Sequence, residues 1–292
     1  MKKKTFIIAE IGPNHNGSIK TAMRMIDQLL NSDVDSIKFQ LGNPEKVYSV
    51  NSFKADYQKQ NDKKDSIIEM ASSYQLSHKD HIKISNYCKK KKIIYSCTAF
   101  DLDSLKFLDK VIKIPFFKIA SGEVFSIDML DYIARSNKPI LLSTGMSTFS
   151  DISLILKKLN KYKKRDITIM HCVSSYPAQK EQLNLNIIDE IKARFNCKLG
   201  YSDHSLDDNA CLIAVAKGAK VIEKHVTISK NLNGPDHKSS ATISEFKKLI
   251  KKIRNFEKIL GNGIKKFSKD EINIQKVARK SITAIKNINI GD

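Results

Sequence analysis

Closely spaced cysteines are missing from this chain of 292 residues. The five cysteines are Cys88, Cys97, Cys172, Cys197 and Cys211; none forms a Cys-x-x-Cys pair, and their number is odd. This spacing excludes a cysteine zinc cluster and a disulfide framework. It predicts reduced thiols in a cytoplasmic protein.

Long apolar runs are also missing. The longest nearly uninterrupted runs, such as Pro139–Leu142 and Ile167–Met170, are far shorter than the roughly 20 residues that a membrane-spanning helix requires. Three lysines follow Met1 as in a signal peptide, but Glu10 interrupts the apolar segment behind them. We therefore expect neither a signal peptide nor a membrane segment.

Arginine is scarce although the chain is strongly basic. Lysine and arginine total 51 against 31 acidic residues, a formal net charge of +20, and only six of the basic residues are arginine. Bidentate reading of DNA bases favours arginine, and most lysine clusters fall in or beside the polar faces of predicted helices. We expect solvated lysines and no nucleic-acid partner; the alternative is a field that attracts anions, including small anionic substrates.

Short β-branched segments alternate with helical patterns along most of the chain. Hydrophobic residues make up 41% and charged residues 28%, which suits a packed core. Eight segments have strand character: Thr5–Ala9, Ser36–Gln40, Ile93–Cys97, Phe116–Ala120, Pro139–Ser143, Ile167–Cys172, Lys198–Ser202 and Lys220–His225. A segment with the apolar spacing of a helix follows each of them. Eight β/α units predict a parallel (β/α)8 TIM barrel, an α/β fold of about 250 residues.

Two segments depart from this regularity. Residues 43–77 form a long excursion after the second strand, on what would be the catalytic face of the barrel. Gly261–Gly263 follow the eighth helix, and the remainder is too short to bury a core of its own. We expect a barrel domain over residues 1–262 and, over 263–292, a linker with the truncated start of another domain.

Active sites of such barrels are built at the carboxyl ends of the strands. Lys38 and Lys118 lie on the second and fourth strands, and hydroxyl groups lie at neighbouring strand ends: Thr98, Ser121, Ser143 and Ser202. Ammonium groups beside hydroxyl donors suit a phosphate and a carboxylate. The alternative is that the hydroxyl groups only cap the following helices.

Three further residues at strand ends carry chemistry. His204 and His225 end adjacent strands, where two imidazoles can bind one divalent ion; the alternative is two hydrogen-bonded core histidines. Glu10 ends the first strand, and burial there would raise its pKa and suit proton transfer; the alternative is a structural ion pair with Lys38.

Several motifs together resemble the sialic acid synthase family, which includes N-acetylneuraminate, legionaminate and pseudaminate synthases. The motifs are Ala9–Gly17, Lys38–Gln40, Lys118–Glu123, Leu142–Met146, Ser202–Ser205, Glu223–His225 and Gly234–His237. They recur in order across residues 5–240, essentially the whole predicted barrel.

The resemblance implies an activity and a domain organisation. It implies condensation of phosphoenolpyruvate with an N-acylated hexosamine, either N-acetylmannosamine or a 2,4-diacetamido-trideoxyhexose, to give a nonulosonic acid and phosphate. It implies Mn²⁺ or Mg²⁺ as cofactor. It also implies a small C-terminal antifreeze-like domain, of which residues 278–292 resemble the beginning, and a domain-swapped homodimer at full length.

The resemblance also implies roles for single residues. Glu10, Lys118 and Asp236 would be catalytic, and His204 and His225 would bind the metal. Substrate contacts are implied for Lys38, Gln40, Asn61, Thr98, Ser121, Glu123, Ser143, Ser174, Tyr176 and Ser202. Ser174 stands where many family members have Asn or Thr, and Leu41-Gly42 replace the usual Thr and aromatic residue, which changes the edge of the pocket.

Two other functions are compatible with these residues. One is a different phosphoenolpyruvate-condensing barrel that makes a seven- or eight-carbon keto acid. The other is a non-catalytic or partner-dependent barrel that binds sugar or phosphate.

Overall fold

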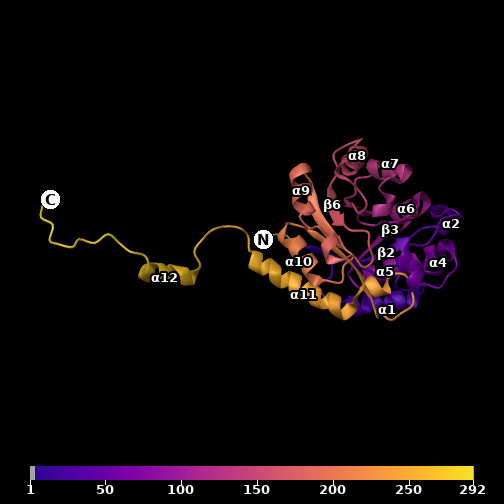
Figure 1. Ribbon diagram of the computed structural model, residues 1–292, viewed down its shortest axis with the longest axis horizontal. Helices are drawn as coiled ribbons and strands as arrows, with labels where there is room; N and C mark the ends of the chain where they lie inside the picture. The colour runs from indigo at the N-terminus through magenta and orange to yellow at the C-terminus, as the bar shows by residue number, and fades with distance from the viewer. Residues whose placement is uncertain (1–3, 292) are drawn as a thin grey trace. The chain divides into compact units, whose positions relative to one another are not determined.

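The computed structural model describes residues 4–291 (Figure 1). The chain divides into two units, one ending at Ile259 and the other comprising the residues from Leu260 onwards. The first unit contains the barrel and every residue predicted to act on substrate.

Eight parallel strands close into a barrel. They are β1 (Phe6–Glu10), β2 (Ser36–Leu41), β3 (Ile94–Ala99), β4 (Phe117–Ile119), β5 (Ile140–Ser143), β6 (Ile167–Cys172), β7 (Lys198–Asp203) and β8 (Val221–Thr227). Neighbours in sequence are neighbours in the sheet, and β1 also pairs with β8, with Glu10 opposite His225. The predicted (β/α)8 barrel is therefore confirmed. A short strand, β9 (Ala241–Thr242), pairs in parallel with the end of β8 and was not predicted.

Helices surround the barrel, as the apolar spacing predicted. In α1 (Ile19–Leu29) the Ser18 hydroxyl caps the amino end, and the four apolar positions at helical spacing are buried. The other barrel helices are α5 (His78–Lys90), α6 (Leu102–Phe107) with the π-turn η1 (Leu108–Ile112), α7 (Ile127–Arg135), α8 (Phe149–Leu159), α9 (Ile187–Arg194), α10 (Asp208–Ala216) and α11 (Ile243–Leu260). Within residues 4–291, no helix is long and apolar enough to cross a membrane.

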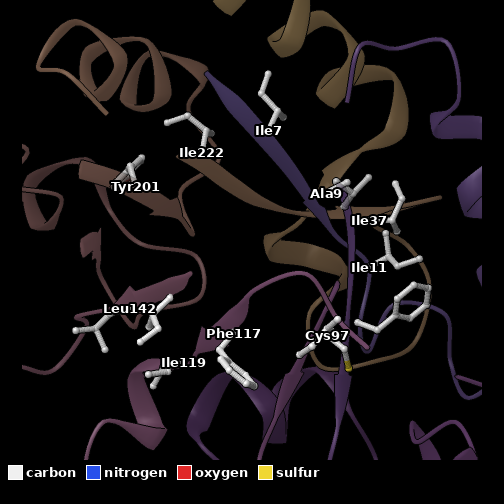
Figure 2. Close-up of a cluster of buried hydrophobic side chains, with 14 of the residues drawn as sticks. Ile7, Ala9, Ile11, Ile37, Cys97, Phe117, Ile119, Leu142, Tyr201 and Ile222 are labelled. Atoms are coloured by element: carbon white, nitrogen blue, oxygen red, sulfur yellow. The ribbon is translucent and has the colours of Figure 1, made fainter. Parts of the chain in front are cut away.

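The core has two layers, set by the alternation of side chains along the strands. Residues such as Ile7, Ala9 and Phe117 pack between the sheet and the helices (Figure 2). Alternate residues, including Ile8 and Met170, form a separate cluster. Because Ile8 and Glu10 are two apart, they share the inner face of β1. Apolar side chains thus fill the barrel towards the amino ends of its strands, and polar groups occupy the carboxyl ends.

The excursion after β2 contains three short helices, α2 (Pro44–Val47), α3 (Asp56–Asn61) and α4 (Ile67–Ser73). The Lys54 ammonium group organises this segment. It donates to the carbonyl oxygens of Asp62 at 2.9 Å and Lys64 at 2.5 Å, and its side chain is buried. The Tyr74 hydroxyl group donates to the carboxylate of Asp62.

The first and last parts of the barrel are tied together. The Thr5 amide donates to Glu257 Oε1 at 2.6 Å, and Arg254 Nη1 donates to the Thr5 carbonyl oxygen at 2.8 Å. Arg254 also forms an ion pair with Asp33 at 2.6 Å. These contacts join α11 to the segment that leads into β1.

The unit after Leu260 contains one helix, α12 (Lys269–Ala278), which the sequence did not predict. The Ser268 hydroxyl group caps it by accepting the Glu271 amide, and the Glu271 carboxylate accepts the Ser268 amide. Large apolar side chains of this unit are exposed, among them Val277, Ile282 and Ile290. The domain boundary at residues 262 and 263 stays a prediction.

Candidate functional site

A cavity of about 390 Å³ opens at the carboxyl ends of the strands. Twelve of the predicted site residues line it: Lys38, Gln40, Thr98, Lys118, Ser121, Ser143, Ser174, Tyr176, Ser202, His204, His225 and Asp236. They come from the strands and from the loops after them, because alternate residues on each strand share the inner face. The structure therefore brings together residues up to 198 positions apart in sequence, from Lys38 to Asp236.

Two buried ammonium groups lie at the base of this cavity. Lys38 Nζ donates to Thr98 Oγ1 at 3.1 Å, and Lys118 Nζ donates to Ser143 Oγ at 2.7 Å. The carboxylate of Glu223 lies between them, with its Oε1 atom 3.6 Å from each nitrogen. The predicted pairing of lysines with hydroxyl groups is thus present.

Glu10 is fully buried beside this group. Its Oε1 atom accepts the Gly12 amide at 2.8 Å, and its Oε2 atom contacts Lys38 Nζ. Burial raises the pKa of Glu10 to about 7, although Lys38 opposes the rise and Glu223 adds to it. The sequence left two alternatives for Glu10, a raised pKa or an ion pair with Lys38. The structure has both.

Glu223 is a site residue that sequence reasoning missed. Burial opposes its ionisation, but Lys118 and Lys38 lower its pKa below the usual range. Ser202 Oγ donates to its Oε1 atom at 3.3 Å. The available signal was its spacing: Glu223 is two residues before His225 on one strand and therefore faces the same interior.

The loop after β5 makes a close approach to the hydroxyl groups. The Gly145 amide donates to Ser121 Oγ at 3.0 Å. A Cβ atom on Gly145 would lie 2.3 Å from Ser174 Oγ and 2.8 Å from Ser121 Oγ. A side chain at this position would therefore displace the two hydroxyl groups.

The two predicted metal ligands face each other. The ring centroids of His204 and His225 are 5.4 Å apart. Burial opposes protonation of His204, but Cys172 and the Val173 carbonyl group raise its pKa above the usual value. His204 Nδ1 donates to the Val173 carbonyl oxygen at 2.7 Å, so in the neutral ring Nε2, 3.2 Å from the Tyr176 hydroxyl group, is the unprotonated nitrogen. This is the tautomer that a metal-binding histidine requires.

His225 has an unused nitrogen. Its Nδ1 atom is buried without a hydrogen-bond partner and lies 3.4 Å from Asp236 Oδ2. Burial and the positive groups around it hold the pKa of His225 well below its usual value, so the ring is neutral. Burial raises the pKa of Asp236 to about 6. Within residues 4–291, no group of three or more His, Cys, Asp or Glu side chains is placed to hold a metal ion. The residues fit an open site with two nitrogen ligands.

Aromatic rings form one wall of the cavity. Tyr57 from the excursion stacks on Tyr176 with centroids 5.1 Å apart, and Tyr176 stacks on His204 at 4.2 Å. Gln40 Nε2 donates to the Gly12 carbonyl oxygen at 2.9 Å. Tyr57, together with Tyr48, is a lining residue that the sequence did not single out.

Three predicted residues do not line the cavity. Glu10 lies behind Lys38. Asn61 Nδ2 donates to the Pro235 carbonyl oxygen at 3.1 Å, so it joins the excursion to the loop that carries Asp236. The Glu123 carboxylate accepts the Ser126 hydroxyl group. Substrate contacts by Asn61 and Glu123 stay predictions.

Comparisons with known proteins relate the chain to one family. Residues 25–265 match the NeuB family. The chain is 40% identical to the N,N'-diacetyllegionaminic acid synthase of Campylobacter jejuni over 99% of its own length and 87% of that protein. It is 35% identical to the enzyme of the same name from Legionella pneumophila, over 95% and 79% of the two chains.

Solved structures give the same result. The crystal structure of N-acetylneuraminic acid synthetase from Leptospira borgpetersenii, in complex with citrate, superimposes with a TM-score of 0.84 at 33% identity. The match covers 96% of this chain and 94% of that chain. Together with its relatives and its matched residues, this likeness shows that the chain belongs to the NeuB family.

Proposed function

We propose that the protein condenses phosphoenolpyruvate with an N-acylated hexosamine and water, giving a nonulosonic acid and inorganic phosphate. The observation that carries the proposal is the pair of buried ammonium groups, Lys38 and Lys118, in the same cavity as two facing imidazoles. The names of the relatives support it, since they are synthases of legionaminic and neuraminic acids. None of these relatives is named as a non-catalytic binding protein.

The lysines account for donor binding. Phosphoenolpyruvate carries a carboxylate and a phosphate, and each can accept from an ammonium and a hydroxyl group. Lys38 with Thr98, and Lys118 with Ser143, provide two such pairs. Because Glu10 and Glu223 contact the two lysines, the ammonium groups are held in place before the donor binds.

The reaction then proceeds in three bond changes. C3 of phosphoenolpyruvate forms a bond to the aldehyde carbon of the open-chain sugar, whose oxygen gains a proton to become a hydroxyl group. Water adds to C2, and Glu10 accepts its proton. As the C2–O bond to phosphate breaks, the C2 hydroxyl group gives its proton to the leaving phosphate and a 2-keto acid remains. The proton that Glu10 accepted from water balances the one that the aldehyde oxygen gained. Glu10 suits this step because its pKa is about 7.

We propose Mn²⁺ or Mg²⁺ as the cofactor. His204 and His225 would hold it, with Asp236 beside His225. A divalent cation supplies a Lewis acid for the aldehyde oxygen of the acceptor. The Tyr176 ring stacks on His204, with centroids 4.2 Å apart, and helps to hold that imidazole in place.

The proposal includes a homodimer and a cytoplasmic setting. The exposed apolar side chains of residues 264–290 would be covered by a second copy of the chain in a domain-swapped arrangement. All five cysteines carry free thiols, which suits a reducing compartment.

A substrate panel tests the activity. Phosphate release from phosphoenolpyruvate is measured with N-acetylmannosamine and with a 2,4-diacetamido-2,4,6-trideoxyhexose, and the product is identified by mass spectrometry. We expect phosphate release only with an acceptor, loss of activity after chelation and recovery with Mn²⁺ or Mg²⁺. Binding of donor and acceptor without phosphate release would support the non-catalytic alternative; full turnover after chelation would contradict the metal assignment.

A further inference from the structure

A buried ion pair lies behind the two histidines and takes no part in the proposed reaction. Lys224 Nζ contacts Asp203 Oδ2, and both side chains are almost completely excluded from solvent. Neither residue lines the substrate cavity, which is bounded by Ser202 and His204 on one strand and by Glu223 and His225 on the other. The pair therefore has no direct access to substrate.

The pair joins the two strands that carry the histidines. Asp203 lies directly opposite Lys224 in the parallel register of β7 and β8. Since side chains alternate between the two faces of a strand, Asp203 and Lys224 point away from the interior that His204 and His225 face. Each charged residue immediately precedes one of the histidines.

Additional hydrogen bonds fix the backbone around His204. Lys224 Nζ donates to the Ser205 carbonyl oxygen at 2.6 Å. Asp203 Oδ1 accepts the Ser205 amide at 2.9 Å and the Tyr201 hydroxyl group at 3.0 Å. The residues on both sides of His204 are thus held by one buried pair, which also belongs to the strand of His225.

We propose that Asp203 and Lys224 are positioning residues, whose ion pair holds the His204 and His225 imidazoles in their facing arrangement. This inference rests on the proposed function, in which the two imidazoles bind a divalent cation. Both the register and the contacts at Ser205 link the pair to the two rings.

A purely stabilising role is the competing explanation. Removing two charges from water is costly, and buried ion pairs can often be replaced by uncharged residues with no loss of stability. A pair that only supported the fold would therefore be replaceable without effect on the rings. A positioning pair would not, because the two strand ends would lose their fixed relation.

The test replaces both charges at once, with Asp203→Asn and Lys224→Met in one protein. Asn keeps an acceptor for Ser205 and Tyr201. Mn²⁺ binding is measured by electron paramagnetic resonance of the free ion, donor binding by calorimetry without metal, and unfolding by thermal melts. We expect the Kd for Mn²⁺ to rise about tenfold or more, as when second-sphere partners of metal ligands are removed. The Kd for phosphoenolpyruvate should change by less than a factor of two.

A matched control uses another ion pair. Asp109 and Lys138 are 2.7 Å apart, and Lys138 precedes β5, at the opposite end of the barrel from the cavity. Asp109→Asn with Lys138→Met makes the same chemical change there, and we expect wild-type Mn²⁺ affinity. Equal Mn²⁺ affinity in the Asp203/Lys224 variant and in this control would overturn the proposal.

Two further measurements keep the outcomes distinct. Nitrogen-15 spectra of the His204 and His225 rings, recorded without metal, should shift in the Asp203/Lys224 variant; unchanged spectra would overturn the proposal even if the wild-type protein binds no Mn²⁺. A wild-type protein that binds no Mn²⁺ would contradict the proposed cofactor but not the proposed positioning role. If the double variant does not fold, Tyr201→Phe removes one hydrogen bond to Asp203, and we expect at least a twofold loss of Mn²⁺ affinity; no loss would overturn the proposal.

Discussion

At the base of the cavity, four charged side chains lie in contact with one another. Glu10 and Glu223 both contact Lys38, and Lys118 contacts Glu223. Burial favours one proton on this group near neutral pH, and Glu10, with its pKa of about 7, is where it resides. The protonation of Glu10 should therefore control the reaction.

The pH dependence of kcat/KM for phosphoenolpyruvate tests this control. If Glu10 accepts the proton of water, it must be ionised, so kcat/KM should rise with pH up to about 7 and then level off. The donor phosphate titrates as well, with a pKa near 6. In Glu10→Gln we expect kcat to fall by about 10²- to 10⁴-fold. The pH profile of kcat/KM should then show only the titration of the donor phosphate. A kcat within threefold of wild type would leave Glu10 a structural partner of Lys38.

Gly145 offers a second test at this scale. Gly145→Ala would place a methyl group against the hydroxyl groups of Ser174 and Ser121, and we expect the Kd for phosphoenolpyruvate to rise at least tenfold. Gly122→Ala is the control, because an added Cβ atom would have no neighbour within 4 Å there. Calorimetric titration measures both. Wild-type donor affinity in Gly145→Ala would place the donor elsewhere.

Secondary-structure elements could be predicted from the sequence to within about two residues at most strand ends. Alternation of β-branched segments with helical spacing is a local signal, and the register between β7 and β8 follows from barrel closure. The helices of the excursion and α12 were not predicted, because they are short or lack a buried face. Their form depends on caps and on contacts distant in sequence.

The site was predictable where residues share a strand face and less so elsewhere. Lys38 and His225 follow from strand ends, but the position of Glu223 between two lysines requires the closed barrel. Asn61 belongs to the excursion, and its bond to Pro235 joins segments 174 residues apart. No local pattern specifies such a contact.

The excursion is expected to serve the acceptor rather than the donor. Lys54→Met removes the ammonium group that holds Asp62 and Lys64, so Tyr57 would lose its fixed place in the cavity wall. We expect the KM for the acceptor to rise about tenfold, as for a loss of roughly 1.4 kcal/mol, with the KM for phosphoenolpyruvate unchanged. Lys59→Met, at an exposed position of the same segment, is the control. A parallel rise in both KM values would show that the excursion supports the whole site.

At the scale of the whole molecule, the barrel and the C-terminal residues are separate units. Because the core ends within α11, a protein ending at Leu260 should fold with a nearly unchanged melting temperature and should bind phosphoenolpyruvate as the longer chain does. We expect it to be monomeric by analytical ultracentrifugation, because the exposed apolar side chains that the proposed dimer would cover are removed. If it unfolds, the barrel depends on the C-terminal unit. If it still dimerises, the C-terminal unit is not the dimer interface.

Because β1 pairs with β8, the eight β/α repeats of the barrel form a closed ring. Thr5 is already hydrogen-bonded to Glu257 and Arg254, so the two ends of this ring meet. A gene that joins these ends by a short Gly-rich linker and opens the chain at the exposed residues 161–164 would code for the same contacts in a different order. Such a circular permutant should keep its cavity. Other proteins could then be attached at the new ends.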